Sequence, residues 1–317
     1  MKISNDKLKT IFRGGYLYEE TEDGYLHAYQ HTKEQMEYFR KTRDFWYVRS
    51  KAGNGKTIEF ITEATEFSFE YKFLWIGSIN SIEIMIDGVI KKIYYPEELG
   101  NEGNISYTME SGKKEVVIYL ATIAEIVIRN FEINAIFTPT KKGAKVLWLG
   151  DSITAGFGAS RSAHTYVNVC NRIMNYDIIN QGVSGYVYDK SSLMEMKGYI
   201  PDKIIVAFGT NNKHDDKERR KCLEEYYERL TQLYPNIPVL CITPIYKNVK
   251  KEEVDLLIEY SGVIREVCSN FSNVTVIDGF KLVGHAQEYF ADAAHPNALG
   301  CEVYGRNLAE TIRKLNW

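Results

Sequence analysis

Four short segments in the second half of the chain contain side chains that could do chemistry together. Ser152 supplies a hydroxyl, and Gly185 and Asn211 supply a backbone and a side-chain N–H donor. Asp292 and His295 lie three positions apart, so the carboxylate can bind one imidazole nitrogen and leave the other free. A nucleophile, a base, a group that orients the base and N–H donors are the parts needed for serine acyl transfer.

Each segment also has an ordinary structural explanation. Ser152 could be the N-cap of a helix, which is a common place for serine. Glycine and asparagine are frequent turn residues, and a lone Asp-x-x-His pair could be a solvated surface turn. The argument therefore depends on the four segments occurring together and in order.

The segments that surround these residues alternate between apolar strands and helices. Strands are expected at 146–149, 177–180, 203–208, 238–243 and 274–277, and helices at 163–174, 217–234, 252–269 and 298–315. Short apolar strands separated by helices predict a parallel sheet covered on both faces, a three-layer α/β/α domain. Sites in such sheets form at the carboxyl ends of the strands, where Ser152, Gly185 and Asn211 are expected.

In the first 136 residues or so, apolar residues recur with a different period, every second position. Apolar residues alternate with polar or small ones at 67–73 and 82–86, and further strands are expected at 116–120 and 126–128. Asp87-Gly88 is typical of a type I′ hairpin, and one short helix is expected near 33–39. This pattern predicts an all-β, jelly-roll-like sandwich. The stretch 138–143 (TPTKKG) marks the boundary, giving domains 1–140 and 141–317.

Four sequence blocks carry a resemblance to a known family. Gly150-Asp151-Ser152, the Gly185 loop, Gly209-Thr210-Asn211 and Asp292-Ala293-Ala294-His295 resemble the blocks of the SGNH (GDSL) hydrolases over roughly residues 145–317. The resemblance implies a flavodoxin-like fold, in agreement with the strand–helix pattern. A β-sandwich before such a domain is similar to the layout of family 2 carbohydrate esterases, which remove acetyl groups from polysaccharides.

The resemblance implies a role for each matched residue. Ser152 is the nucleophile, His295 the general base and later the general acid, and Asp292 orients the imidazole. The backbone N–H groups of Ser152 and Gly185 and the amide of Asn211 form the oxyanion hole, and no metal or organic cofactor is required. One departure is Asn212, where the family usually has Asp; we expect this change to affect loop structure more than chemistry.

Other residues could take the same roles. Ser184 is a rival nucleophile, but it does not fit the G-x-S-x-G elbow of other hydrolases. His285 and His164 are rival bases, but no carboxylate lies at a matching offset from His285, and His164 is better explained as a surface or capping residue. The run His214-Asp215-Asp216 could suggest a metal, although a solvated loop is the simpler explanation.

Composition excludes several classes of protein. The 317 residues include 39 Lys plus Arg and 42 Asp plus Glu, a net charge of −3, which disfavours a nucleic-acid binder. No run of about 18 apolar residues predicts a membrane span, and residues 1–12 do not form a signal peptide. The five cysteines (Cys170, Cys222, Cys241, Cys268, Cys301) form no metal-ligand pattern, so we expect reduced thiols in a cytoplasmic protein.

These observations lead to an expected function with two alternatives. The first expectation is an esterase that removes O-acetyl groups from xylan- or mannan-type oligo- or polysaccharides. The alternatives are a lipase- or thioesterase-type acylhydrolase, and a glycan-binding protein whose hydrolase domain is inactive. The 23 tyrosines could stack on sugar rings, although packing in cores and on strand faces explains most of them equally well.

Overall fold

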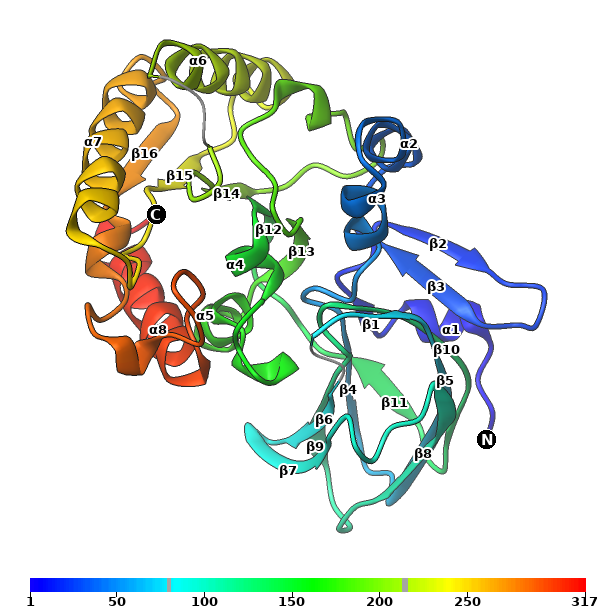
Figure 1. Cartoon of the computed structure of the whole chain (residues 1–317). Helices are drawn as coiled ribbons and strands as arrows, with labels where there is room; N and C mark the ends of the chain where they lie inside the picture. The colour runs from blue at the N-terminus through cyan, green and yellow to red at the C-terminus, as the bar shows by residue number, and fades with distance from the viewer. Residues whose placement is uncertain (79–80, 213–215) are drawn as a thin grey trace.

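The computed structural model describes residues 1–78, 81–212 and 216–317. Figure 1 shows two halves side by side: a β-rich N-terminal half, and a C-terminal half in which helices surround a sheet. The predicted fold class, an α/β sandwich preceded by a β-rich region, is confirmed. No helix within the described ranges is long and apolar enough to cross a lipid bilayer.

The N-terminal half packs two antiparallel sheets face to face. Within the described residues their strand orders are β1-β4-β9-β6-β7, with β11 beside β4, and β2-β3-β10-β5-β8. The elements are α1 (Asn5–Lys9), β1 (Phe12–Arg13), β2 (Leu17–Glu20), β3 (Leu26–Tyr29), α2 (Lys33–Thr42), α3 (Asp44–Ser50), β4 (Thr57–Thr62), β5 (Glu66–Ile76), β6 (Ile82–Ile86), β7 (Val89–Tyr94), β8 (Glu102–Thr108), β9 (Lys114–Tyr119), β10 (Ala124–Ile133) and β11 (Phe137–Pro139).

Alternating burial explains how these strands form a core. In β5 the side chains of Phe67, Phe69 and Tyr71 are buried, while the residues between them are half-buried. The buried set packs between the two sheets, as period-two strands require. The hairpin between β6 and β7 turns at Asp87 and Gly88, which both have positive φ (49° and 79°), as a type I′ turn demands.

The C-terminal half is built on a parallel sheet with the order β13-β12-β14-β15-β16. Its side chains pack into one apolar cluster with α6 and α7 and into another with α5 and α8. The elements are β12 (Lys145–Gly150), α4 (Ser152–Ala155), η1 (Ser162–His164), α5 (Tyr166–Met174), β13 (Asp177–Gly182), η2 (Lys190–Ser192), β14 (Lys203–Ala207), α6 (Asp216–Leu233), β15 (Val239–Ile242), α7 (Lys251–Cys268), β16 (Val274–Ile277), η3 (Gly279–Lys281), η4 (Gln287–Tyr289) and α8 (Ala298–Leu315).

The register of this sheet brings three strand ends to one edge. Gly150, the last residue of β12, pairs with Gly182 at the end of β13 and with Ala207 at the end of β14. The loops after these strands therefore begin at the same level, as expected for a site at the carboxyl edge of a parallel sheet.

Helices of the N-terminal half pack against the C-terminal half. The pattern predicts α2 but not α3, and both lie beside the C-terminal half in Figure 1. Phe39 of α2 and Trp46 of α3 pack against Tyr186, with ring centroids 5.2 and 4.8 Å apart. The Gln35 side chain hydrogen-bonds Gln181 and the carbonyl of Ser192. The N-terminal half thus supports the loop that follows β13.

Candidate active site

Ser152 occupies the first turn of a short helix directly after a buried strand. Asp151, not Ser152, is the N-cap of α4: its carboxylate accepts a hydrogen bond from the N–H of Ile153 at 3.0 Å. The explanation of Ser152 as a capping residue is therefore wrong, and its hydroxyl is free for other partners. Gly150 has to be small here, because a Cβ on it would lie 2.1 Å from Oγ1 of Thr154.

The hydroxyl of Ser152 faces the imidazole of His295. Ser152 Oγ lies 2.8 Å from Nε2, and Nδ1 lies 2.8 and 3.0 Å from the two carboxylate oxygens of Asp292. This serine is 6% exposed, whereas the side chains of His295 and Asp292 are 20% and 48% exposed. In the neutral imidazole whose Nδ1–H donates to Asp292, the lone pair of Nε2 can accept the serine proton.

Asp292 is held as an anion. Burial alone would raise its pKa, but hydrogen bonds from the N–H groups of Ala294 and His295 and from the imidazole outweigh that effect. The pKa therefore lies below the usual value. The two N–H groups donate to Oδ1 at 2.8 Å each, and this fixes the carboxylate within its own loop. In the predicted roles, an ionised Asp292 would stabilise the imidazolium formed when Ser152 attacks.

Two residues beside His295, Phe157 and Gly158, were not predicted as site residues from the sequence. The Phe157 ring packs against the imidazole at a centroid distance of 4.6 Å. Gly158 has φ +92°, and a Cβ on it would lie 2.6 Å from the carbonyl oxygen of Pro296 and 2.9 Å from the His295 Cβ. The sequence does contain one signal for these two residues. They follow shortly after the Gly150-Asp151-Ser152 block, and Gly156 and Gly158 flank Phe157.

The predicted oxyanion donors lie on the two neighbouring loops. Gly185 adopts φ +73°, a conformation that glycine adopts without strain. The Asn211 side chain donates one hydrogen bond to the carbonyl of Tyr186 at 3.1 Å, which leaves its second amide hydrogen for another acceptor. The oxyanion-hole role of Ser152, Gly185 and Asn211 stays a prediction.

Replacing Asn211 with alanine tests that role. The variant is expected to lower kcat for 4-nitrophenyl acetate by about a hundred- to a thousandfold, the usual effect of losing one preorganised donor. KM should change little, because the oxyanion forms after the ester binds. An equal loss of thermal stability and activity would indicate that Asn211 only holds the Tyr186 loop.

Asn212, the departure from the family pattern, is 7% exposed. Both polar atoms of its side chain lack a hydrogen-bond partner within the described ranges. The expectation that it affects loop structure stays a prediction. Of the neighbouring run His214-Asp215-Asp216, the first two residues lie outside the described residues.

The three rival residues, His285, His164 and Ser184, do not form the contacts with other described residues that a catalytic base or nucleophile would need. His285 Nε2 lies 2.7 Å from the carbonyl oxygen of Phe280, and His164 contacts the guanidinium of Arg161. Ser184 is 8% exposed, and no histidine is bonded to its hydroxyl in the part of the chain that the structure describes. Three or more metal-ligating side chains do not cluster anywhere in those same ranges.

Asp151 is a buried acid next to Ser152 in the chain. It is 1% exposed, and burial raises its pKa to about 7. A carboxyl whose pKa is higher in the folded state than in the unfolded state binds its proton more tightly when folded. Its contribution to stability is therefore present at low pH and is lost as the pH rises from about 4 toward 7.

Replacing Asp151 with asparagine removes this titration while keeping an N-cap oxygen. The free energy of unfolding of Asp151→Asn, relative to wild type, is expected to rise by roughly 2–4 kcal/mol between pH 4 and pH 8. Urea unfolding at a series of pH values measures the difference. Parallel curves for the two proteins across this range would contradict the burial argument.

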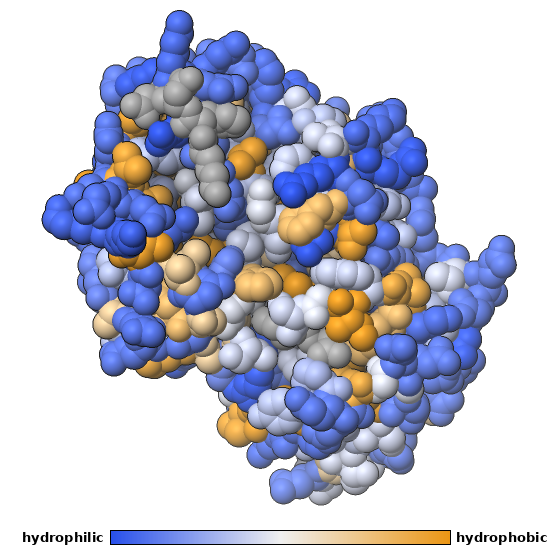
Figure 2. Space-filling view, viewed as in Figure 1, coloured by the Kyte–Doolittle hydropathy of each residue, from blue (hydrophilic) through white to orange (hydrophobic). Residues whose placement is uncertain are grey.

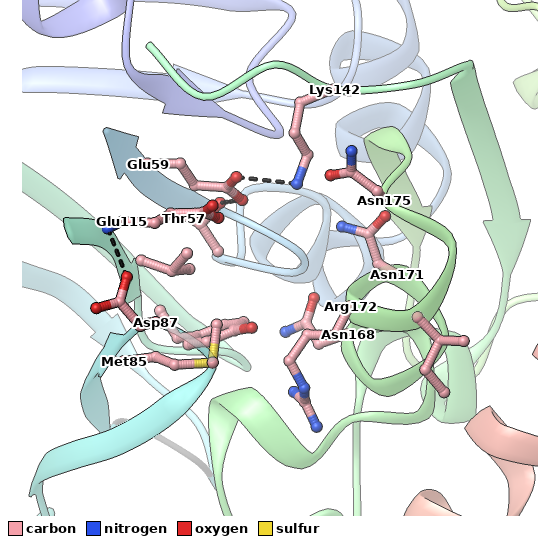
Figure 3. A pocket seen from close by; sticks show the side chains of 14 residues that line it. Thr57, Glu59, Met85, Asp87, Glu115, Lys142, Asn168, Asn171, Arg172 and Asn175 are labelled. Atoms are coloured by element: carbon pink, nitrogen blue, oxygen red, sulfur yellow. Dashed lines mark hydrogen bonds and ion pairs between the residues drawn. The ribbon is translucent and has the colours of Figure 1, made fainter. Parts of the chain in front are cut away.

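A separate cavity lies between the two halves, away from Ser152. It has a volume of about 460 Å³ and lies between strands β4, β6 and β9 and helix α5. Figure 3 shows Lys142 reaching across it to Glu59, with a distance of 2.9 Å between the charged atoms, and Asn168, Asn171 and Arg172 facing the strands. Ser152 and His295 do not line it, so this cavity is not the catalytic site.

Comparisons with known proteins agree with this geometry. Residues 148–303 match the model of the "GDSL-like Lipase/Acylhydrolase family". No curated protein sequence matches the chain. Among solved structures, the fold is similar to the salicylyl-acyltransferase SsfX3 from a tetracycline biosynthetic pathway (TM-score 0.80, 15% identity, covering 100% of this chain and 97% of the other).

Two family 2 carbohydrate esterases are also similar in fold. One, from Cellvibrio japonicus, has a TM-score of 0.68 and 14% identity, covering 99% of this chain and 97% of its own. The other, from Clostridium thermocellum in complex with cellohexaose, has a TM-score of 0.66 and 16% identity, covering 84% and 94%. The predicted resemblance is confirmed: residues 148–303 belong to the GDSL-like lipase/acylhydrolase family, and the chain is a carboxylic ester hydrolase.

Proposed function

We propose that this protein removes O-acetyl groups from acetylated oligo- or polysaccharides of the xylan or mannan type. The observation that carries the proposal is the hydrogen-bonded series Ser152–His295–Asp292, with distances of 2.8 Å at both links. The similarity in fold to family 2 carbohydrate esterases along almost the whole chain supports a saccharide as the alcohol part of the ester.

The chemistry proceeds in two steps. Ser152 Oγ attacks the ester carbonyl carbon while its proton passes to His295 Nε2. The N–H donors of Ser152, Gly185 and Asn211 stabilise the negative oxygen of the tetrahedral intermediate, and the sugar oxygen leaves with the proton from Nε2. Water then attacks the acetyl-enzyme by the same route, giving acetate and free Ser152.

Acyl-chain preference tests the proposal. Wild type should release acetate from acetylated xylan or mannan oligomers and should cleave 4-nitrophenyl acetate faster than 4-nitrophenyl octanoate. Faster cleavage of octanoate or longer esters would favour the lipase or thioesterase alternative. Binding of the oligomers in calorimetry with no release of acetate would favour a glycan-binding protein.

A second candidate is acyl transfer to an alcohol in place of water. The similarity to a salicylyl-acyltransferase over the full chain favours it. The same acyl-enzyme would form, and an alcohol would replace water in the second step. Adding a sugar acceptor to an assay with 4-nitrophenyl acetate distinguishes them, because a transferase gives a new acetylated sugar and a hydrolase gives acetate only.

The state of the cysteines supports a reducing compartment. All five cysteines are free, and all except Cys222 are buried. We propose a cytoplasmic protein acting on oligosaccharide fragments, with no nucleic acid or membrane as its partner.

A further inference from the structure

A group of cationic and aromatic side chains lies on and beside α3, in the N-terminal half. We call Arg43, Phe45, Trp46, Arg49 and Trp75 the α3 arginine cluster. The Arg49 guanidinium lies 3.4 Å from the centroid of the Phe45 ring and 5.3 Å from that of Trp75. The Arg43 guanidinium lies 4.9 Å from the same Phe45 ring and 5.6 Å from Trp46. Two guanidinium groups, those of Arg43 and Arg49, therefore contact the same ring, that of Phe45.

This cluster adjoins the predicted oxyanion hole. A Cβ on Gly185 would lie 3.4 Å from Cε1 of Phe45 and 4.0 Å from Nε1 of Trp46. Trp46 also packs edge-on against Tyr186, whose carbonyl accepts the hydrogen bond from Asn211. The cluster thus lies against the Gly185 loop, which is part of the predicted site. Figure 2 shows apolar and weakly polar residues along the middle of this face, where the two halves meet, and hydrophilic residues around them.

Among the described residues, no carboxylate pairs with the arginines of the cluster. Neither Arg43 nor Arg49 has a carboxylate within 4 Å in residues 1–78, 81–212 and 216–317, and Arg49 donates only to the carbonyl of Phe45 at 3.3 Å. The nearest acid in sequence, Asp44, is exposed, and the carboxylate of Asp189 accepts hydrogen bonds from Tyr38 and Tyr186 instead.

Two further observations concern the positive charge of Arg49 and the N–H donor of Trp46. Burial and the charge of Arg43 lower the pKa of Arg49, so both effects act against its positive charge. The Trp46 Nε1–H is buried and has no acceptor among the described residues. An anion placed here would relieve the repulsion between the guanidinium groups and accept their free N–H donors.

We propose that the α3 arginine cluster binds an anionic group of the substrate, a carboxylate or a phosphate carried by the saccharide whose acetyl ester lies at Ser152. Guanidinium groups bind both anions through paired N–H donors, and the aromatic rings offer faces on which a sugar can stack. This inference rests on the proposed function for the saccharide, and it adds that the preferred saccharide is acidic.

Matched substrates test the inference. Acetylated galacturonate oligomers and an acetylated glucose phosphate carry the anion, and acetylated xylo-oligomers of equal length do not. Wild type is expected to show a lower KM for an acidic substrate than for the neutral one. Arg43→Gln and Arg49→Gln should each raise the KM for the acidic substrate about 10- to 100-fold, with kcat nearly unchanged, because each removes charge-assisted hydrogen bonds. The acidic substrate with the lower KM identifies the anion as carboxylate or phosphate.

Controls separate recognition from folding. Arg40→Gln, on the neighbouring α2, removes an exposed arginine that is paired with Glu37, and it should leave every KM unchanged. Arg40→Gln should also cleave 4-nitrophenyl acetate like wild type. If Arg43→Gln and Arg49→Gln change acidic and neutral substrates equally, or if wild type does not prefer the acidic ones, the inference is wrong.

A pair of small esters distinguishes this inference from the proposed function. 4-Acetoxybenzoate carries a carboxylate on the alcohol side, and 4-acetoxybenzamide is its neutral match. If acetylated saccharides are not cleaved but wild type prefers the benzoate and Arg49→Gln loses that preference, anion binding stands and the saccharide proposal fails. If acetylated saccharides are cleaved, but neither the saccharides nor the small esters show a preference for the charged substrate, the saccharide proposal stands and anion binding fails.

Discussion

Replacing Ser152 with alanine is expected to lower kcat for 4-nitrophenyl acetate by about 10⁴- to 10⁶-fold, with little change in stability. The reason is that Ser152 Oγ lies 2.8 Å from His295 Nε2, so the substitution removes the nucleophile and leaves the imidazole without a proton to accept. The residual rate reflects substrate binding and the oxyanion donors. Initial rates, with circular dichroism as a check on folding, measure the effect.

Ser184→Ala provides the matched control. Ser184 is also buried, at 8% exposure against 6% for Ser152, and lies next to Gly185. Its replacement should leave kcat within a few-fold of wild type. Equal rates for Ser152→Ala and wild type, or a large loss in Ser184→Ala alone, would refute the assignment of the nucleophile.

Replacing Asp292 with asparagine is expected to lower kcat by about 10²- to 10⁴-fold. Oδ1 of Asp292 accepts two backbone N–H groups, so the asparagine oxygen will occupy that position and its NH₂ group will face Nδ1 of His295. The imidazole must then carry its proton on Nε2, where it can donate to Ser152 but cannot accept. The partial exposure of Asp292, 48%, explains the wide range, because water can replace part of the interaction.

Glu288→Gln is the control for this substitution. Glu288 is an exposed carboxylate in the η4 turn just before the same loop, and it forms no contact with His295 within the described ranges. The control should retain wild-type activity. Unchanged activity in Asp292→Asn would show that His295 is oriented by other groups.

The sequence predicts the parallel sheet well, because a buried strand and an amphipathic helix differ clearly in length and period. Strand β16 and helix α8 lie at their predicted bounds, and the other predicted C-terminal elements deviate by a few residues at their ends, whereas the short helix α4 was not predicted. The convergence of Ser152 and His295 also follows from the sequence, since parallel strands end at one edge and the last loop must cross that edge to reach α8.

What the sequence does not predict depends on contacts between distant segments. Helix α3 is short, and its position against Gly185 is determined by the packing of Trp46 on Tyr186, which no local pattern shows. The Phe157 ring is placed against His295 by two loops that are far apart in the chain. Hydrophobic periodicity and short motifs therefore could not predict which residues of the N-terminal half adjoin the site.

Covalent labelling tests the central claim most directly. A fluorophosphonate reacts with an activated serine, and its added mass can be assigned to one peptide by mass spectrometry. Wild type should be labelled once, on Ser152, and His295→Ala should be labelled far more slowly, because the hydroxyl then has no base. Labelling on Ser184, or equal labelling of wild type and His295→Ala, would contradict the account.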